Sequence, residues 1–207
     1  MDVDQTRKDI VVVGASAGGV DALIKFFAGL PADLAASIFV VLHIPSESPS
    51  HLAPILERAC RLPVKEAEDL ESIDPGQIYV ASADRHLMID GHRIRVTRGP
   101  RESRVRPSID VLFRSASVSF GARVIAVVMS GTLDDGTAGA WAVKDRGGLV
   151  LVQEPSDAIH ASMPESVIQH VKVDHVGTAQ ELGNMIAGLA GAPAPPVPSK
   201  PSHGHSV

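Results

Sequence analysis

A serine lies in a glycine-rich turn directly after a run of apolar residues near the start of the chain. Residues 10–13 (IVVV) are typical of a buried strand, and residues 14–19 (GASAGG) separate them from a helix-like stretch at 20–30. The glycines allow a sharp turn from strand to helix, and the amide groups that begin the helix face whatever Ser16 contacts. Such a turn suits either a catalytic nucleophile or a phosphate-binding loop.

Runs rich in valine and isoleucine alternate with helical segments along most of the chain. This alternation is typical of an α/β fold, and we expect a doubly wound, mainly parallel sheet in a Rossmann-like three-layer arrangement. The strands are expected at residues 10–13, 37–42, 123–129 and 149–152, and the helices at 20–30, 49–60, 107–119, 137–146 and 178–190.

The segment 63–106 interrupts this alternation. Its apolar runs are short, and turn sequences separate them at 74–76 (DPG) and 90–91 (DG). We therefore expect a small antiparallel β insertion. Its strands are expected at residues 77–80, 87–89 and 93–96.

Length and composition predict one domain that needs neither disulfides nor a membrane. A chain of 207 residues can bury a full core, and its single cysteine, Cys60, excludes an internal disulfide. The first residues lack the apolar region of a signal peptide, and no apolar run approaches the ~20 residues that cross a bilayer. We expect a cytoplasmic protein, without direct membrane insertion, whose domain spans residues 9–190. The proline-rich segment 191–207 is expected to be a disordered tail.

Charge gives little reason to expect nucleic acid as a partner. The net charge is −5, and aromatic residues make up only 3% of the chain. One basic stripe stands out, which is most simply a solvated surface and alternatively a landing surface for an acidic partner. Its arginines are Arg93, Arg95, Arg98, Arg101, Arg104 and Arg106.

Serine, histidine and aspartate follow three of the expected parallel strands. Ser16 follows the first strand and His43 the second, while Asp135 lies in the loop after the strand at 123–129. Because the carboxyl ends of parallel strands share one edge of a sheet, these groups are expected to meet there. A hydroxyl needs a neutral imidazole to take its proton, and the imidazole needs a carboxylate to orient it. Of the two adjacent aspartates, Asp135 is the better candidate for this role and Asp134 for a helix cap.

Two other families share parts of the first motif. Residues 14–18 match the G-x-S-x-G elbow of α/β-hydrolases, but there several strands precede the serine and the order of the triad is Ser, acid, His. As a dinucleotide fingerprint, residues 14–19 lack the middle glycine, and the second strand ends in His43 rather than an acidic residue. A nucleotide-binding domain therefore stays a minor alternative.

From about residue 10 to residue 190 the chain resembles the catalytic domain of the CheB family, the chemotaxis protein-glutamate methylesterases. Six blocks in the same order carry the resemblance. They are residues 14–19 (GASAGG), 43–45 (HIP), 64–69 (VKEAED), 79–87 (YVASADRHL), 106–113 (RPSIDVLF) and 130–136 (SGTLDDG).

The resemblance implies a serine hydrolase that acts on methylated chemoreceptors. Family members remove glutamate methyl esters from the cytoplasmic domains of these receptors and release methanol, and many also deamidate glutamines. The triad maps onto Ser16 as nucleophile, His43 as general base and Asp135 as the residue that orients His43. Neither a metal nor another cofactor is expected. Most members also carry an amino-terminal receiver domain, whereas here the first expected strand begins near residue 9.

Further site residues are expected around this triad. Backbone amides of Ala17 and Thr132 are the expected donors to the oxyanion. His86 and Arg106 lie in family-like blocks and are candidates for substrate binding, with loop-fixing hydrogen bonds as the alternative. A non-catalytic module that binds receptors stays an alternative to the enzyme.

Overall fold

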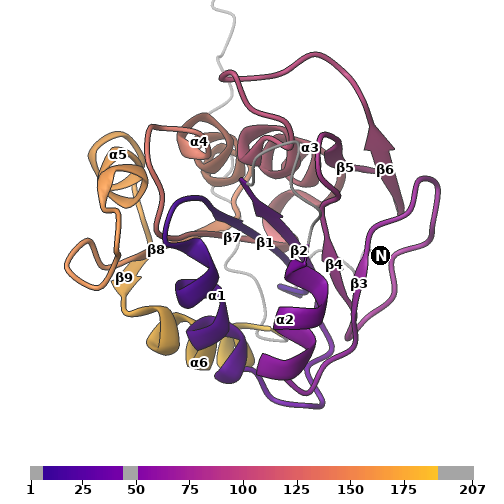
Figure 1. Ribbon diagram of the computed structural model, residues 1–207, viewed down its shortest axis with the longest axis horizontal. Coiled ribbons are helices and arrows are strands. Elements are labelled where there is room, and N and C mark those ends of the chain that lie inside the picture. Colours follow the sequence, from indigo (N-terminus) through magenta and orange to yellow (C-terminus); the bar gives the residue numbers. More distant parts are fainter. Residues whose placement is uncertain (1–6, 44–50, 191–207) are drawn as a thin grey trace, which may run out of the picture.

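The structure is a computed structural model that describes residues 7–43 and 51–190. Within these residues a seven-stranded parallel sheet runs through the middle of the molecule in the order β3-β4-β2-β1-β7-β8-β9 (Figure 1). The central strands are β1 (Ile10–Ala15), β2 (Ser37–Leu42), β7 (Val124–Val128) and β8 (Leu149–Gln153). The shorter strands towards the edges are β3 (Val64–Glu66), β4 (Ile78–Val80) and β9 (His175–Gly177).

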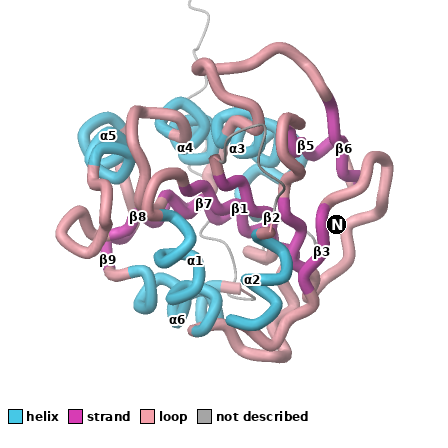
Figure 2. The backbone as a smooth tube through the Cα atoms, in the orientation of Figure 1, coloured by secondary structure: helices cyan, strands magenta, loops and turns pink. Residues whose placement is uncertain are grey.

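Helices cover both faces of the sheet, as Figures 1 and 2 show. One face carries α1 (Gly19–Ala28), α2 (Leu52–Ala59) and α6 (Ala179–Leu189), and the other carries α3 (Ile109–Phe120), α4 (Thr137–Asp145) and α5 (Ser162–His170). The side chains of β1 alternate between the two cores: Val11 and Val13 pack under α1 and α6, while Val12 packs under α3. The predicted fold class, a doubly wound three-layer α/β domain, is confirmed.

The chain reverses its direction of winding at β1. It leaves β1 for β2 on one side and returns much later to β7 on the other, and Gly14 lies opposite Val41 of β2 and Val128 of β7. Such a switch point opens a crevice at the carboxyl ends of the strands, where α/β folds bind their ligands. The carboxyl end of β1 is therefore the place to look for a site.

The predicted antiparallel insertion is partly wrong. Only β5 (His86–Asp90) and β6 (Arg93–Thr97) form an antiparallel hairpin, which lies beside α3. The predicted strand at 77–80 instead becomes β4, which pairs in parallel with β2 and β3. Its residues Ile78–Val80 are all buried, as expected for a strand covered on both faces.

Within the described residues, the sequence did not predict the strands β3 and β9, the helix α5 or the short 3-10 helix at Gly121–Arg123. The two strands have three residues each, too few to show a period. In α5 the apolar pattern is sparse, since Met163 and Val167 supply the buried side chains together with Pro164 in the first turn. No helix in the described part of the chain is long and apolar enough to cross a membrane. The tail predicted at 191–207 lies outside the described residues.

Candidate active site

Ser16 stands at the carboxyl end of β1, in a turn that glycine makes possible. Its amide donates to the carbonyl of Ser130 at 2.9 Å, which continues the pairing between β1 and β7 beyond the strand ends. Gly18 then adopts a φ of 71° at the start of α1. A Cβ atom there would lie 2.6 Å from Cβ of Ile159 and 2.8 Å from Oγ of Ser130, so both conformation and space require glycine. The turn leaves Ser16 partly exposed.

His43 follows β2 and lies beside the serine turn. Its amide donates to the carbonyl of Ala15 at 3.0 Å, so the ladder between β1 and β2 also continues past the strands. The imidazole is 14% exposed, and its Nε2 lies 2.7 Å from a carboxylate oxygen of Asp135. The structure thus brings together the histidine and the aspartate that the sequence places on separate strands.

Asp135 is buried and surrounded by donors from the start of α3. One carboxylate oxygen accepts from His43 and from the amide of Ile109, at 2.7 Å in each case. The other accepts from the hydroxyl of Ser108 and from the amide of Asp110, at 3.0 Å in each case. A helix N-terminus favours a negative charge, so α3 both locates this carboxylate and stabilises it.

The environment keeps Asp135 ionised. Burial acts to raise the pKa of this carboxyl, but the hydrogen bond from His43 and those from the amides of Asp110 and Ile109 outweigh burial and lower the pKa below its ordinary value. A carboxylate in this state can fix the orientation of His43 and stabilise its cation. Because Nε2 is bonded to Asp135, Nδ1 is the ring nitrogen that can accept a proton.

Ser16 is near this pair but is not hydrogen-bonded to it. Within the described residues no hydrogen bond joins the hydroxyl of Ser16 to His43. The segment that follows His43, residues 44–50, lies outside them. Catalytic hydrogen bonds are often long in the absence of substrate and tighten when it binds. The role of Ser16 as nucleophile therefore stays a prediction.

The two amides predicted to bind the oxyanion have no acceptor. Among residues 7–43 and 51–190, the backbone amides of Ala17 and Thr132 donate to no other group, whereas the amide of Gly131, the residue before Thr132, donates to the carbonyl of His160 at 3.0 Å. Thr132 is exposed and Ala17 is partly exposed. Both amides are thus available to a ligand, and their role stays a prediction.

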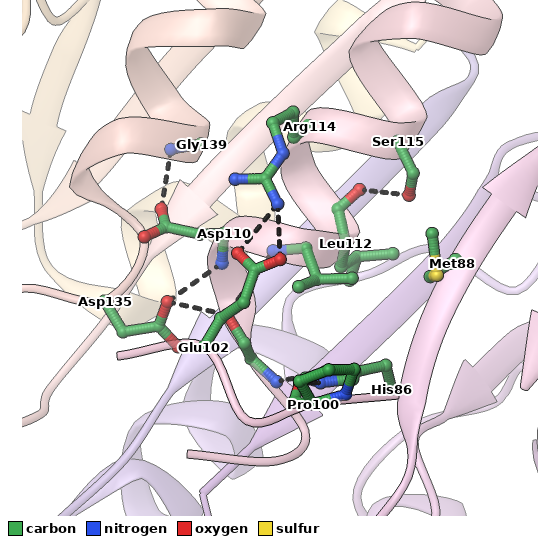
Figure 3. Close-up of polar contacts among 12 residues, drawn as sticks. His86, Met88, Pro100, Glu102, Asp110, Leu112, Arg114, Ser115, Asp135 and Gly139 are labelled. Carbon is green, nitrogen blue, oxygen red and sulfur yellow. Dashed lines mark hydrogen bonds and ion pairs between the residues drawn. The ribbon is translucent and has the colours of Figure 1, made fainter. Parts of the chain in front are cut away.

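His86 and Arg106 are engaged in fixing loops. His86 is 3% exposed; its Nδ1 accepts from the amide of Ser108 at 3.2 Å, and its Nε2 consequently donates to the carbonyl of Pro100 at 2.8 Å (Figure 3). Arg106 donates twice to one carboxylate oxygen of Asp84, at 2.7 and 3.0 Å. A substrate would have to break these bonds, so the geometry supports the loop-fixing alternative.

A second buried aspartate, Asp110, was missed by the sequence reading. One of its oxygens accepts from the amides of Gly136 and Gly139, at 3.0 and 2.6 Å, and so caps α4 (Figure 3). Asp134 was expected to cap this helix, but the N-cap residue is Gly136 and the carboxylate comes from α3. Burial and the nearby charge of Asp135 raise the pKa of Asp110 to about 6. No local signal identifies such a cap, because it comes from another helix.

Ser108 is the other residue that sequence reasoning did not assign. Its hydroxyl donates to Asp135 and accepts from the amide of Val111 at 3.4 Å, as an N-cap residue of α3. The sequence predicts this helix from residue 107, which places Ser108 inside it, whereas the helix begins at Ile109 with Ser108 as its N-cap.

Among the residues that the structure describes, carboxylates contact four of the six arginines of the basic stripe, and Asp84 alone serves three of them, Arg98, Arg101 and Arg106. Arg95 pairs with Asp69, and Arg98 pairs with the same Asp84 that holds Arg106. This sharing leaves more positive than negative charge on the stripe, so a solvated surface and a landing surface for an acidic partner both stay predictions. In the described part of the chain no group of three or more His, Cys, Asp and Glu side chains is placed to hold a metal ion.

Comparison with known proteins agrees with this geometry. The family model for CheB methylesterase matches residues 11–186. A Leptospira interrogans protein named as a protein-glutamate methylesterase/protein-glutamine glutaminase is 36% identical over 182 residues, which cover 87% of this chain and 94% of that protein. Protein-glutamate methylesterase/protein-glutamine glutaminase 1 of Geobacter metallireducens is 37% identical over 88% of this chain. The match spans 51% of the Geobacter protein, about half its length.

A solved structure shows the same fold. The catalytic domain of the Thermotoga maritima CheB methylesterase is 33% identical, covers 88% of this chain and 98% of its own, and superposes with a TM-score of 0.83. The segment that the family model matches contains Ser16, His43 and Asp135. The chain belongs to the CheB methylesterase family.

Proposed function

We propose that this chain hydrolyses glutamate methyl esters on the cytoplasmic helices of methylated chemoreceptors, releasing methanol in the cytoplasm as part of chemotactic adaptation. The observation that carries the proposal is the hydrogen bond between the partly exposed His43 and the buried Asp135 at the carboxyl edge of the sheet, beside Ser16. The names of the relatives support the same activity, including the deamidation of glutamine as a second reaction.

The residues support a two-step reaction through an acyl-serine. The hydroxyl oxygen of Ser16 attacks the ester carbonyl while Nδ1 of His43 takes the hydroxyl proton. The carbonyl electrons move onto the oxygen, which the amides of Ala17 and Thr132 receive. When the tetrahedral intermediate collapses, methoxide leaves and takes the proton from His43 as methanol. Water then attacks the acyl-serine with His43 as base, which frees the glutamate carboxylate and restores the Ser16 hydroxyl.

Asp135 supports both steps without exchanging a proton. Its hydrogen bond to Nε2 of His43 leaves Nδ1 unprotonated in the neutral ring, and its charge stabilises the cation formed when Ser16 loses its proton. The four donors around the carboxylate keep it fixed while the charge on His43 changes.

The test is methanol release from receptor cytoplasmic fragments that carry isotopically labelled methyl esters. Ser16→Ala should reduce release at least about 10³-fold with an unchanged circular dichroism spectrum, because no nucleophile remains. Ser156→Ala is the matched control, since Ser156 is an exposed serine after β8 and should leave the rate unchanged. Undiminished release by the Ser16 variant contradicts the proposal, and so does a chain that binds the fragments without turnover. Fragments with glutamine in place of the ester measure the second reaction by ammonia release.

A further inference from the structure

The N-termini of α3 and α4 are capped by carboxylates that the two helices exchange. Asp110, in the first turn of α3, accepts from the amides of Gly136 and Gly139 at the start of α4. Asp135, directly before α4, accepts from the amides of Ile109 and Asp110 at the start of α3. The start of α3 thus binds a carboxylate from the loop before α4, and the start of α4 binds a carboxylate from α3.

The contact between the two helices is too tight for either carboxylate to move alone. A Cβ atom on Gly139 would lie 2.6 Å from Cβ of Phe113 and 3.0 Å from Cα of Asp110, so the backbones approach as closely as glycine permits. Asp110 and Asp135 are 7% and 3% exposed. Moving Asp110 away from Gly139 would move the start of α3, and with it two of the donors to Asp135.

We propose that Asp110 is a positioning residue for hydrolysis: it locks Asp135 beneath His43, and its negative charge helps Asp135 to stabilise the His43 cation. This inference rests on the proposed triad. Asp110 touches neither substrate nor the reacting atoms, so its effect reaches the reaction through Asp135.

The charge of Asp110 changes between pH 5 and pH 8. Burial and the proximity of Asp135 raise its pKa to about 6, so the carboxyl is neutral at pH 5 and ionised at pH 8. The other charged or titratable groups around it come from the loop before α4, from α5, from its own helix and from the active site. They are Asp135 and Asp134, His170, Arg114 with its partner Glu102, and His43 behind Asp135.

Asp110→Asn separates the charge from the cap. The amide oxygen of asparagine can still accept from Gly136 and Gly139, while the negative charge is absent at every pH. Wild type and variant should therefore have similar kcat/KM below about pH 5, where Asp110 is protonated. Above pH 6 they should diverge, reaching roughly 3- to 10-fold lower kcat/KM for the variant at pH 8 with KM unchanged, because the variant lacks the charge that supports the His43 cation.

Two further variants distinguish the loss of the Asp110 charge from a general loss of stability. Thr178→Ala removes the capping box of α6, far along the chain from the triad, and should lower stability while the pH profile keeps its wild-type shape. His170→Gln replaces the last residue of α5, a histidine that lines the same pocket as Asp110, and should also keep the wild-type profile. A ratio of wild-type to Asp110→Asn kcat/KM that stays constant from pH 5 to pH 8 overturns the proposal, because it would show that the charge of Asp110 does not contribute to the reaction.

A measurement without turnover keeps the inference distinct from the proposed function. In the wild-type protein, the amide resonances of Gly136 and Gly139 should shift with a midpoint near pH 6, and the amide of Ile109 should report the same step through Asp135. The absence of this step overturns the proposal even if Asp110→Asn fails to fold. Failure of the proposed function would instead appear as a wild-type chain without esterase activity, or as a fully active Ser16→Ala.

Discussion

Gly131 and Ser16 approach so closely that a Cβ atom on Gly131 would lie 2.8 Å from the Cβ of Ser16. The glycine is held from both sides, since its amide donates to His160 and its carbonyl accepts from the amide of Met163, at 3.0 Å in each case. The backbone of the loop after β7 therefore packs directly against Ser16, and only a residue without a side chain fits at position 131.

Gly131→Ala should reduce kcat by at least about tenfold while the chain still folds. The new methyl group meets the flexible end of Met163, which can move, and Ser16, which cannot move without leaving its place beside His43. Steady-state methanol release measures the loss. Gly188→Ala is the matched control, because nothing lies within 4 Å of a Cβ at Gly188 in α6, and this change should leave kcat unchanged and stabilise the helix by up to about 1 kcal/mol. Equal kcat values for the two variants would show that the position of Ser16 does not depend on a glycine at position 131.

Ser108→Ala should lower both stability and activity. It removes a donor to Asp135 and the N-cap of α3, so we expect a loss of about 1 kcal/mol in the free energy of unfolding and a several-fold fall in kcat. Urea denaturation and kinetics at pH 7.5 measure the two effects. Thr178→Ala, a cap variant on α6, should show only the first. If both variants keep full activity, Asp135 does not depend on the Ser108 hydroxyl.

His86→Leu should destabilise the protein without weakening substrate binding. The change leaves the buried amide of Ser108 without its acceptor and removes the donor to the carbonyl of the exposed Pro100, at a cost of about 1 to 3 kcal/mol. KM should stay within about twofold of the wild-type value. Arg85→Ala, at the exposed neighbouring position, should change neither quantity. A raised KM with unchanged stability would restore His86 as a substrate-binding residue.

The stability of the protein should fall as pH rises from about 4 to about 6. The pKa of Asp110 is raised from 3.8 to about 6 by burial and by Asp135, so in this window the folded chain holds a proton that the unfolded chain has lost. The lowered pKa of Asp135 acts in the opposite direction, but only below the ordinary aspartate range, where its contribution is lost on acidification. Urea denaturation at pH 4.5 and 7.5 should show Asp110→Asn gaining about 2 kcal/mol on the wild type at the higher pH. If the free energies of unfolding of the two proteins changed equally between pH 4.5 and 7.5, the raised pKa of Asp110 would be contradicted.

Much of the fold is predictable because its central strands are buried on both faces. Continuous apolar runs such as residues 10–13 and 124–128 reveal these strands, and the rule that parallel strands end at one edge brings Ser16, His43 and Asp135 together. The short run at 77–80 was assigned to the wrong sheet because neighbouring turn sequences do not reveal which strand it pairs with. Pairing partners are a property of the folded molecule.

The residues around Asp135 were harder to predict for the same reason. Asp110 reads as an ordinary acidic residue in the first turn of a helix, and only the contact between α3 and α4 turns it into a cap for Gly136 and Gly139. His86 lies in a block shared with the family, yet its partners Pro100 and Ser108 are set by the path of the loop after β6. Local sequence shows which groups are present, whereas long-range packing decides what each of them contacts.

Because α3 and α4 exchange their caps, the carboxylate beside His43 is in place only when both helices have docked. A chain that had formed β1 and β2 would already present Ser16 and His43 on adjacent strand ends. It would have no carboxylate at His43 until α3 and α4 had docked, because Asp135 comes 92 positions later and is held by the start of α3. In the proposed mechanism, a partly unfolded chain in which α3 and α4 have not docked therefore lacks the carboxylate that orients His43.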